Sequence, residues 1–137
     1  MKLLMSTLIA ASAAASAVLA QTTAPLQRTP IASHTLPGIT VDHVPVVRLD
    51  FKPGQPTGRH VHPMPVIGYV LEGAFVVKVE GRPEQRFTAG QSILEPANVT
   101  IERFDNASTT QPAVLIAHYL AGPGQTELIH LLPAEQK

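Results

Sequence analysis

The chain has 137 residues, with ten lysines and arginines, ten aspartates and glutamates, and no cysteine. This length suits one domain with a modest core, and a near-neutral charge without a basic run argues against nucleic acid and against an anionic membrane surface as partners. Without cysteine there is no disulfide, no thiolate nucleophile and no zinc–sulfur site, so stability must come from the hydrophobic core.

Residues 1–20 have the composition of a secretory signal peptide. Lys2 is followed by the apolar, alanine-rich run LLMSTLIAASAAASAV, and the small residues of VLA precede Gln21. The run is short and alanine-rich for a spanning helix, which needs about 20 predominantly apolar residues; an uncleaved anchor is the alternative. We therefore expect cleavage before Gln21, a periplasmic or secreted location, and no membrane attachment after cleavage.

Residues 21–39 are rich in Thr, Pro and Ser without periodicity, which predicts a flexible tail or linker. From residue 40 to residue 132 the pattern is one of short apolar strands separated by Gly and Pro, and no segment has a helical period. Two stretches, VPVVRLDF and AFVVKVEG, place apolar residues at every second position, on one face of a strand: Val47, Leu49, Phe51, Phe75, Val77 and Val79. Further strands are expected in RFTAGQSILEPANVTIERF, PAVLIAHYL and TELIHLL. This pattern predicts an all-β sandwich or small antiparallel barrel.

The stretch PGQPTGRHVHPMPVIGYVLEGAFVV contains a pair of histidines, His60 and His62, at positions i and i+2. On an extended strand both imidazoles leave the same face, about 7 Å apart along the chain. Two imidazoles at this spacing can converge on one transition-metal ion inside a barrel. The pair alone is a weak signal, because surface histidines also fall at this spacing by chance.

The surroundings of the pair resemble the first motif of the cupin family, which is a glycine, five residues, His-x-His, a glutamate and a closing glycine. Gly54, His60, His62 and Gly73 stand at these spacings. The second cupin motif has a counterpart in Gly90 and Pro96, followed by FDNAS. The resemblance extends from about residue 41 to residue 122. It implies a single cupin-type antiparallel β-barrel, a double-stranded β-helix or jelly roll, over residues 40–132.

The resemblance leaves the metal ligands open. Val66 stands where the cupin glutamate is expected, and Ile101 stands where the second-motif histidine falls when no gap is allowed. A one-residue insertion in the turn after Pro96 places Glu102 there instead, and Asn106 then fits the asparagine that follows. With the gap, the expected metal ligands are His60, His62 and Glu102, a two-histidine, one-carboxylate set.

Without the gap, Ile101 points inward, Glu102 faces solvent, and only two imidazoles remain. Strand alternation does not decide between the registers, because each places an apolar residue inward. Glu95 and Glu102 form a carboxylate pair in one segment, with nothing in the sequence that places them in one pocket. His118, in LIAHYL, is expected to be half-buried and hydrogen-bonded to a neighbouring strand.

The resemblance implies two functions. The first is an exported, metal-dependent enzyme, dioxygenase- or isomerase-like, that acts on a small organic molecule with Fe(II), Mn(II), Ni(II), Cu(II) or Zn(II) as cofactor. The alternative is a non-catalytic small-ligand-binding module with a vestigial metal site, which Val66 favours because it makes that wall apolar. Because small barrels of this kind leave sheet edges open, a homodimer is expected as well.

Overall fold

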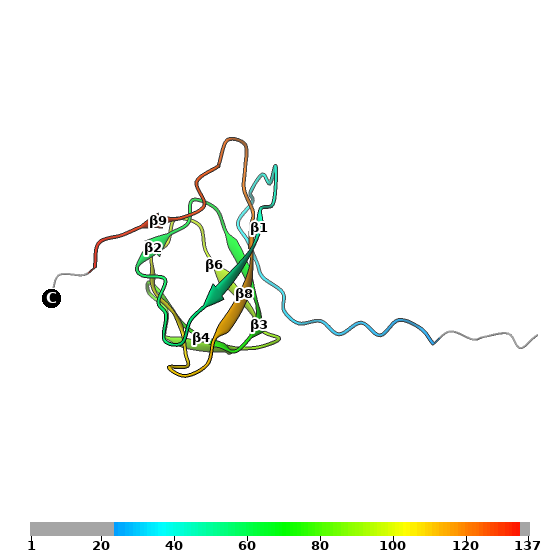
Figure 1. Cartoon of the computed structure of the whole chain (residues 1–137). Helices are drawn as coiled ribbons and strands as arrows, with labels where there is room; N and C mark the ends of the chain where they lie inside the picture. Colours follow the sequence, from blue (N-terminus) through cyan, green and yellow to red (C-terminus); the bar gives the residue numbers. More distant parts are fainter. Residues whose placement is uncertain (1–23, 135–137) are drawn as a thin grey trace, which may run out of the picture.

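The computed structural model describes residues 24–134. The expected signal peptide, residues 1–20, lies outside the described residues, as do residues 21–23 of the expected tail. Residues 24–33 are exposed and extend away from the rest of the molecule (Figure 1). Among residues 24–134, no helix is long and apolar enough to cross a membrane.

The described part of the chain forms nine strands in two antiparallel sheets that face each other as a barrel (Figure 1). The first sheet has the order β1 (Val46–Phe51), β8 (Ala113–Tyr119), β3 (Val66–Glu72) and β6 (Ser92–Glu95). The second has the order β5 (Gln85–Thr88), β4 (Ala74–Val79), β7 (Ile101–Asn106), β2 (His60–Val61) and β9 (His130–Leu131). The predicted all-β, antiparallel architecture is confirmed.

The core fills the space between the two sheets, and the predicted alternation places it there. In β4, Phe75, Val77 and Val79 are buried, as expected for one inward face. Phe75 packs against Phe51 of the opposite sheet and against Phe104 of its own, with ring centroids 5.0 and 5.3 Å apart. The contact between Phe51 and Phe75 joins the two sheets.

Strand β7 contains a β-bulge that determines which of its side chains point inward. Lys78 pairs with Arg103, but the next residue of β4, Val79, pairs with Ile101, so Glu102 is an extra residue opposite β4. The bulge allows Ile101 and Phe104, three residues apart, both to be buried. Alternation alone allows only one of them on the inner face.

Candidate metal centre

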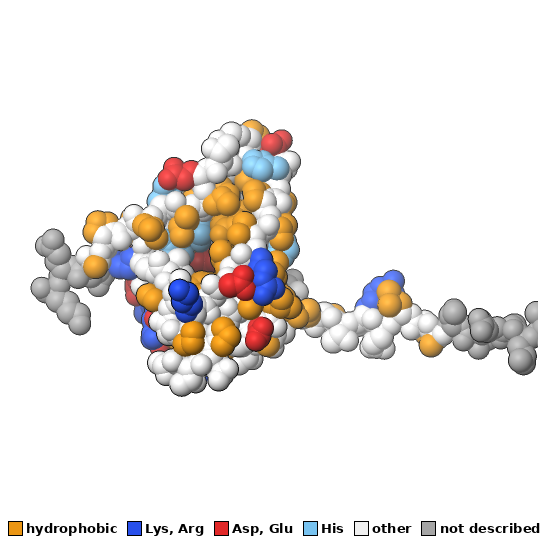
Figure 2. Space-filling model, in the orientation of Figure 1, with side chains coloured by type: hydrophobic (Ala, Val, Ile, Leu, Met, Phe, Trp, Pro, Cys, Tyr) orange, Lys and Arg blue, Asp and Glu red, His pale blue; other side chains and the backbone are white. Residues whose placement is uncertain are grey.

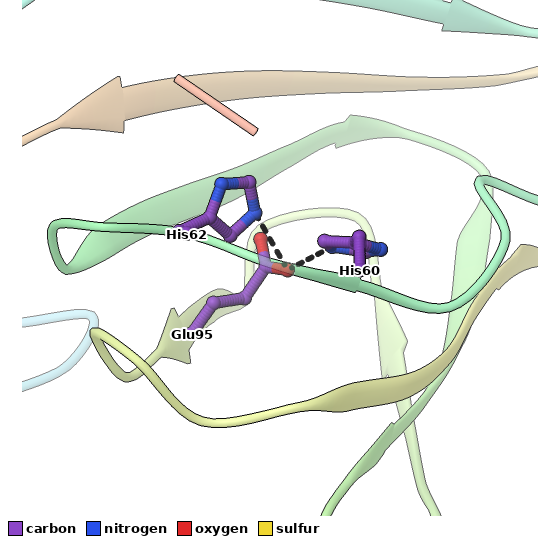
Figure 3. Close-up of side chains that lie close together, drawn as sticks. All are labelled: His60, His62 and Glu95. Carbon is purple, nitrogen blue, oxygen red and sulfur yellow. Dashed lines mark hydrogen bonds and ion pairs between the residues drawn. The ribbon is translucent and has the colours of Figure 1, made fainter. Parts of the chain in front are cut away.

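Three side chains, supplied by β2 with the residue after it and by β6, converge inside the barrel (Figure 3). His60 lies in β2, His62 follows directly after it, and Glu95 ends β6. The Glu95 Oε2 atom lies 3.2 Å from His60 Nε2 and 3.4 Å from His62 Nε2. All three side chains are at least nine-tenths buried, since their exposed fractions are 2%, 3% and 4%.

Local backbone geometry explains why these side chains meet. The i, i+2 spacing turns both imidazoles to the same side, with ring centroids 4.9 Å apart. Gly58, two residues before His60, has a φ of 90°, a conformation that only glycine adopts readily. In β6, Glu95 is two residues after the buried Ile93, so both side chains share the inner face.

Each histidine is held by a hydrogen bond from its other ring nitrogen. His60 Nδ1 donates to the Gly58 carbonyl at 2.7 Å, and His62 Nδ1 donates to the Leu128 carbonyl at 2.6 Å. A carbonyl oxygen can only accept, so each Nδ1 carries the proton and each Nε2 is directed at Glu95. This arrangement, with one nitrogen anchored and the other presented, is the usual one for histidines that bind metals.

The electrostatics of the group favour a cation between the histidines and Glu95. Burial disfavours charge on His62, but the hydrogen bond and charge of Glu95, together with the Leu128 carbonyl, raise the pKa of His62. Burial alone would raise the pKa of Glu95, but the two histidines lower it. A neutral imidazole with its proton on Nδ1 would turn a lone pair toward a carboxylate lone pair. These contacts are therefore satisfied either by a proton shared between the Glu95 carboxylate and an imidazole Nε2 or by a metal ion.

The distances and donor types fit a divalent transition metal. Two ligands that each lie about 2.1 Å from one ion are separated by roughly 3.0–3.4 Å when they subtend angles between a right angle and the tetrahedral angle. The two distances to Glu95 Oε2, 3.2 and 3.4 Å, agree with this range. Two imidazoles and one carboxylate form a recognised ligand set that leaves coordination positions open.

The three side chains line a cavity of about 390 Å³. Its walls are mainly apolar and come from β1, β7, β8 and the C-terminal segment, and Figure 2 shows hydrophobic side chains around a hollow with histidine and acidic groups inside it. Tyr119 also lines the cavity, and its ring centroid lies 5.6 Å from that of His62. Burial and the charge of Glu95 raise the pKa of Tyr119, so its hydroxyl keeps its proton at neutral pH.

The structure brings His60 and His62 together, as expected from their spacing, but it does not bring Glu102 to them. Glu102 is the bulge residue of β7, and its carboxylate forms an ion pair with Lys78 at 3.3 Å, with a third of its side chain exposed. Ile101 is fully buried, as in the ungapped register. The extra residue that the gapped alignment placed in the turn lies in the strand instead.

Two other expected residues have structural roles. Asn106 is buried and donates from Nδ2 to the carbonyls of Lys52 and Gln111, so it ties the end of β7 to two loops. His118 is half-buried and bonds to the Ile67 carbonyl of the neighbouring strand at 3.2 Å, which confirms that expectation.

The sequence analysis missed Glu95 as a partner of the two histidines. A signal for it existed in the stretch SILE, because Glu95 shares a strand face with the apolar Ile93. A strand of four residues is too short for this alternation to stand out. Glu102 also matched the family pattern when a gap was allowed, so Glu102 rather than Glu95 was expected to be the carboxylate ligand.

Comparison with known proteins identifies relatives of the fold. The cupin domain family model matches residues 47–119, more than half of the chain. A search of curated protein sequences found no significant match.

Similar solved structures include an oxalate oxidase, with 24% identity and a TM-score of 0.56 over 65% of this chain and 46% of that one. They also include the DMSP lyase DddQ from Ruegeria pomeroyi, with 17% identity and a TM-score of 0.58 over 69% and 45%. A cupin-like protein from Thermotoga maritima has 23% identity and a TM-score of 0.56 over 66% and 65%. The chain spans about half the length of the first two structures, and at these identities the similarity concerns the fold.

Proposed function

The chain belongs to the cupin domain family, and we propose that it is a metal-dependent enzyme acting on a small organic molecule, with His60, His62 and Glu95 as its metal ligands. The observation that carries this proposal is the convergence of three buried donor groups, two of them with their second nitrogen already anchored. Anchoring fixes each ring before an ion arrives, which lowers the entropy cost of binding.

An ion in this position would supply Lewis-acid or redox chemistry next to the cavity. Fe(II), Mn(II), Ni(II), Cu(II) and Zn(II) are all compatible with two imidazoles and a carboxylate. The cavity walls are mainly apolar, and the protonated Tyr119 hydroxyl offers a hydrogen-bond donor to a small molecule bound there. The hydroxyl makes no hydrogen bond to any residue that the structure describes, so it is available to a substrate.

The similar solved structures support an enzymatic function but do not indicate a specific reaction. The similar structures include an oxalate oxidase and a DMSP lyase, which catalyse different reactions on one architecture. Fold similarity therefore favours small-molecule chemistry here without giving the substrate. The proposed reaction is dioxygenase- or isomerase-like chemistry on a small organic compound.

Export is part of the same proposal. Its support is the sequence of residues 1–20, a positive residue, an apolar run and small residues before Gln21. N-terminal sequencing of protein from the extracytoplasmic fraction should begin at Gln21. An intact Met1 on exported protein would contradict cleavage.

The competing function is that of a non-catalytic binding module. A turnover assay distinguishes it from the enzyme. Metal-reconstituted protein would be incubated with a set of small phenols, diketones and organic acids, and loss of each compound would be followed by mass spectrometry. If the protein is an enzyme, turnover should disappear in metal-stripped protein and in Glu95→Gln, but persist in Glu102→Gln. Ligand binding without turnover of any compound in either metal state would favour the binding module.

A further inference from the structure

The charges around the cavity are unevenly distributed. Apart from the two histidines, its ionisable lining consists of two carboxylates, the buried Glu95 and the exposed Asp50 of β1, and of the uncharged Tyr119. Among residues 24–134, no lysine or arginine lines it. The remaining lining is largely apolar, with Phe104, Leu115, Ile129 and Leu131 among its residues.

An arginine adjacent to this lining in β1, Arg48, is already engaged. Arg48 donates to both Asp50 carboxylate oxygens, with three contacts of 2.8, 3.1 and 3.2 Å. Both side chains are more than half exposed, so this is a neutral, solvated pair at the edge of the cavity. An incoming anion would have to displace Asp50 to reach the guanidinium.

The charge of the metal centre itself follows from its ligands. A divalent ion contributes two positive charges, Glu95 contributes one negative charge, and imidazoles that bind through Nε2 are neutral. The loaded centre therefore carries one net positive charge inside a cavity with apolar walls. One negative charge on the ligand neutralises it, whereas a second negative charge would be buried without a partner.

We propose that the cavity selects ligands with a single negative charge at the metal-binding head and an uncharged, mainly apolar body, and that it disfavours compounds with a second, distal anionic group. This inference rests on the proposed metal centre and narrows its substrate class to enols, phenols, diketones or monocarboxylic acids with an apolar body. The cavity volume, about 390 Å³, is at the small end of ligand pockets. The ligand is accordingly compact.

The test compares three redox-stable chelators that share one head. Benzohydroxamic acid binds metals as a monoanion, its para-methyl analogue adds apolar volume, and its para-carboxy analogue adds a distal charge at the same place. Zn²⁺ is titrated first into metal-free, untagged protein by calorimetry, and each chelator is then titrated into the Zn²⁺ form. Dissociation constants, rather than activity, are the readout.

We expect the para-methyl compound to bind as well as or better than the parent, and the para-carboxy compound to bind about tenfold or more weakly than the para-methyl compound. Two matched variants test the cause. Thr57→Arg adds a cation to the cavity lining and should recover most of the affinity for the para-carboxy compound. Thr40→Arg adds the same charge at an exposed residue of a separate groove and should not.

Each outcome bears on a different claim. If Zn²⁺ does not bind, the metal centre itself is wrong and the inference falls with it. If Zn²⁺ binds but the para-carboxy compound binds within about twofold of the para-methyl compound, the metal centre stands and the charge selection is refuted. If Zn²⁺ binds and none of the three chelators does, the cavity is not the ligand site, which also refutes the inference.

Discussion

Val66 and Glu95 are directly paired across the antiparallel strands β3 and β6, and both side chains are buried on the inner face. Residues paired in this way have Cβ atoms about 4.5–5.5 Å apart on one face of the sheet. Val66 occupies the position at which the cupin motif has its glutamate. The carboxylate that faces the two histidines therefore comes from the adjacent strand rather than being absent.

This pairing predicts that the carboxylate ligand can be moved from residue 95 in β6 to residue 66 in β3. Glu95→Val should weaken metal binding by more than the roughly 10–100-fold typical of losing an outer partner of a ligand. The double variant Val66→Glu with Glu95→Val should recover much of that loss, because the glutamate returns to the same face one strand away. Metal affinity is measured by competition with a chromogenic chelator.

Val66→Glu alone serves as the control for this exchange. It places a second buried carboxylate beside Glu95, and the metal-free protein should melt at a lower temperature because two like charges share an apolar site. The exchange account fails if the double variant binds no more tightly than Glu95→Val while both remain folded by circular dichroism.

The bulge in β7 predicts opposite costs for two neighbouring residues. Ile101 is fully buried, so Ile101→Ala should cost about 2–5 kcal/mol of unfolding free energy. Glu102 makes only a partly exposed ion pair with Lys78, so Glu102→Gln should change stability by about 0.5 kcal/mol or less. Urea denaturation measures both free energies. A large loss for Glu102→Gln together with a small loss for Ile101→Ala would contradict the assignment of Ile101 to the interior.

In the metal-free protein, the contribution of His62 to stability should fall as the pH rises above 6.5. The pKa of His62 is raised above 6.5, so its stabilising protonation is complete below that value and is lost as the pH rises through the folded-state pKa. The pKa of Glu95 is lowered below 4.5, so its contribution is present above that value and is lost in stronger acid. This pair is therefore most stabilising between these two pH values.

A bound metal ion should oppose this loss of stability at higher pH. The ion competes with the proton for Nε2 and therefore binds more tightly as the pH rises. Thermal melting at mildly acidic and mildly alkaline pH, with chelator or with Zn²⁺, should show the metal-induced rise in Tm growing with pH. His118→Gln is the matched control, since His118 lies outside the group and bonds to a backbone carbonyl. A metal-induced shift that shrinks with pH would contradict the assignment of these nitrogens.

The sequence was sufficient for the fold because the fold depends on repeated signals. Alternating apolar residues in β1 and β4 and glycines at turns each point to short antiparallel strands, and an error in one strand leaves the others intact. Gly73 illustrates the turn signal: its φ is 76°, and a Cβ there would lie 2.9 Å from the Pro112 carbonyl oxygen.

The site depends on single residues, and there the sequence was insufficient. One bulge residue in β7 decides whether Ile101 or Glu102 points inward, and bulges have no strong composition signal. The partnership of His62 with the Leu128 carbonyl joins residues 66 positions apart, and no periodicity encodes such a contact. The histidine pair was found because both of its members lie in one short segment with regular spacing.

The most direct test of the metal centre is the metal content of untagged protein, measured by plasma mass spectrometry for wild type, Glu95→Gln and Glu102→Gln after reconstitution and removal of free ions. The absence of a histidine tag matters because tag imidazoles bind the same ions. The account predicts about one equivalent of a divalent transition metal in wild type and in Glu102→Gln, and a loss of most of it in Glu95→Gln. A metal-replete Glu95→Gln protein, or a metal-free Glu102→Gln protein that is still folded, would contradict it.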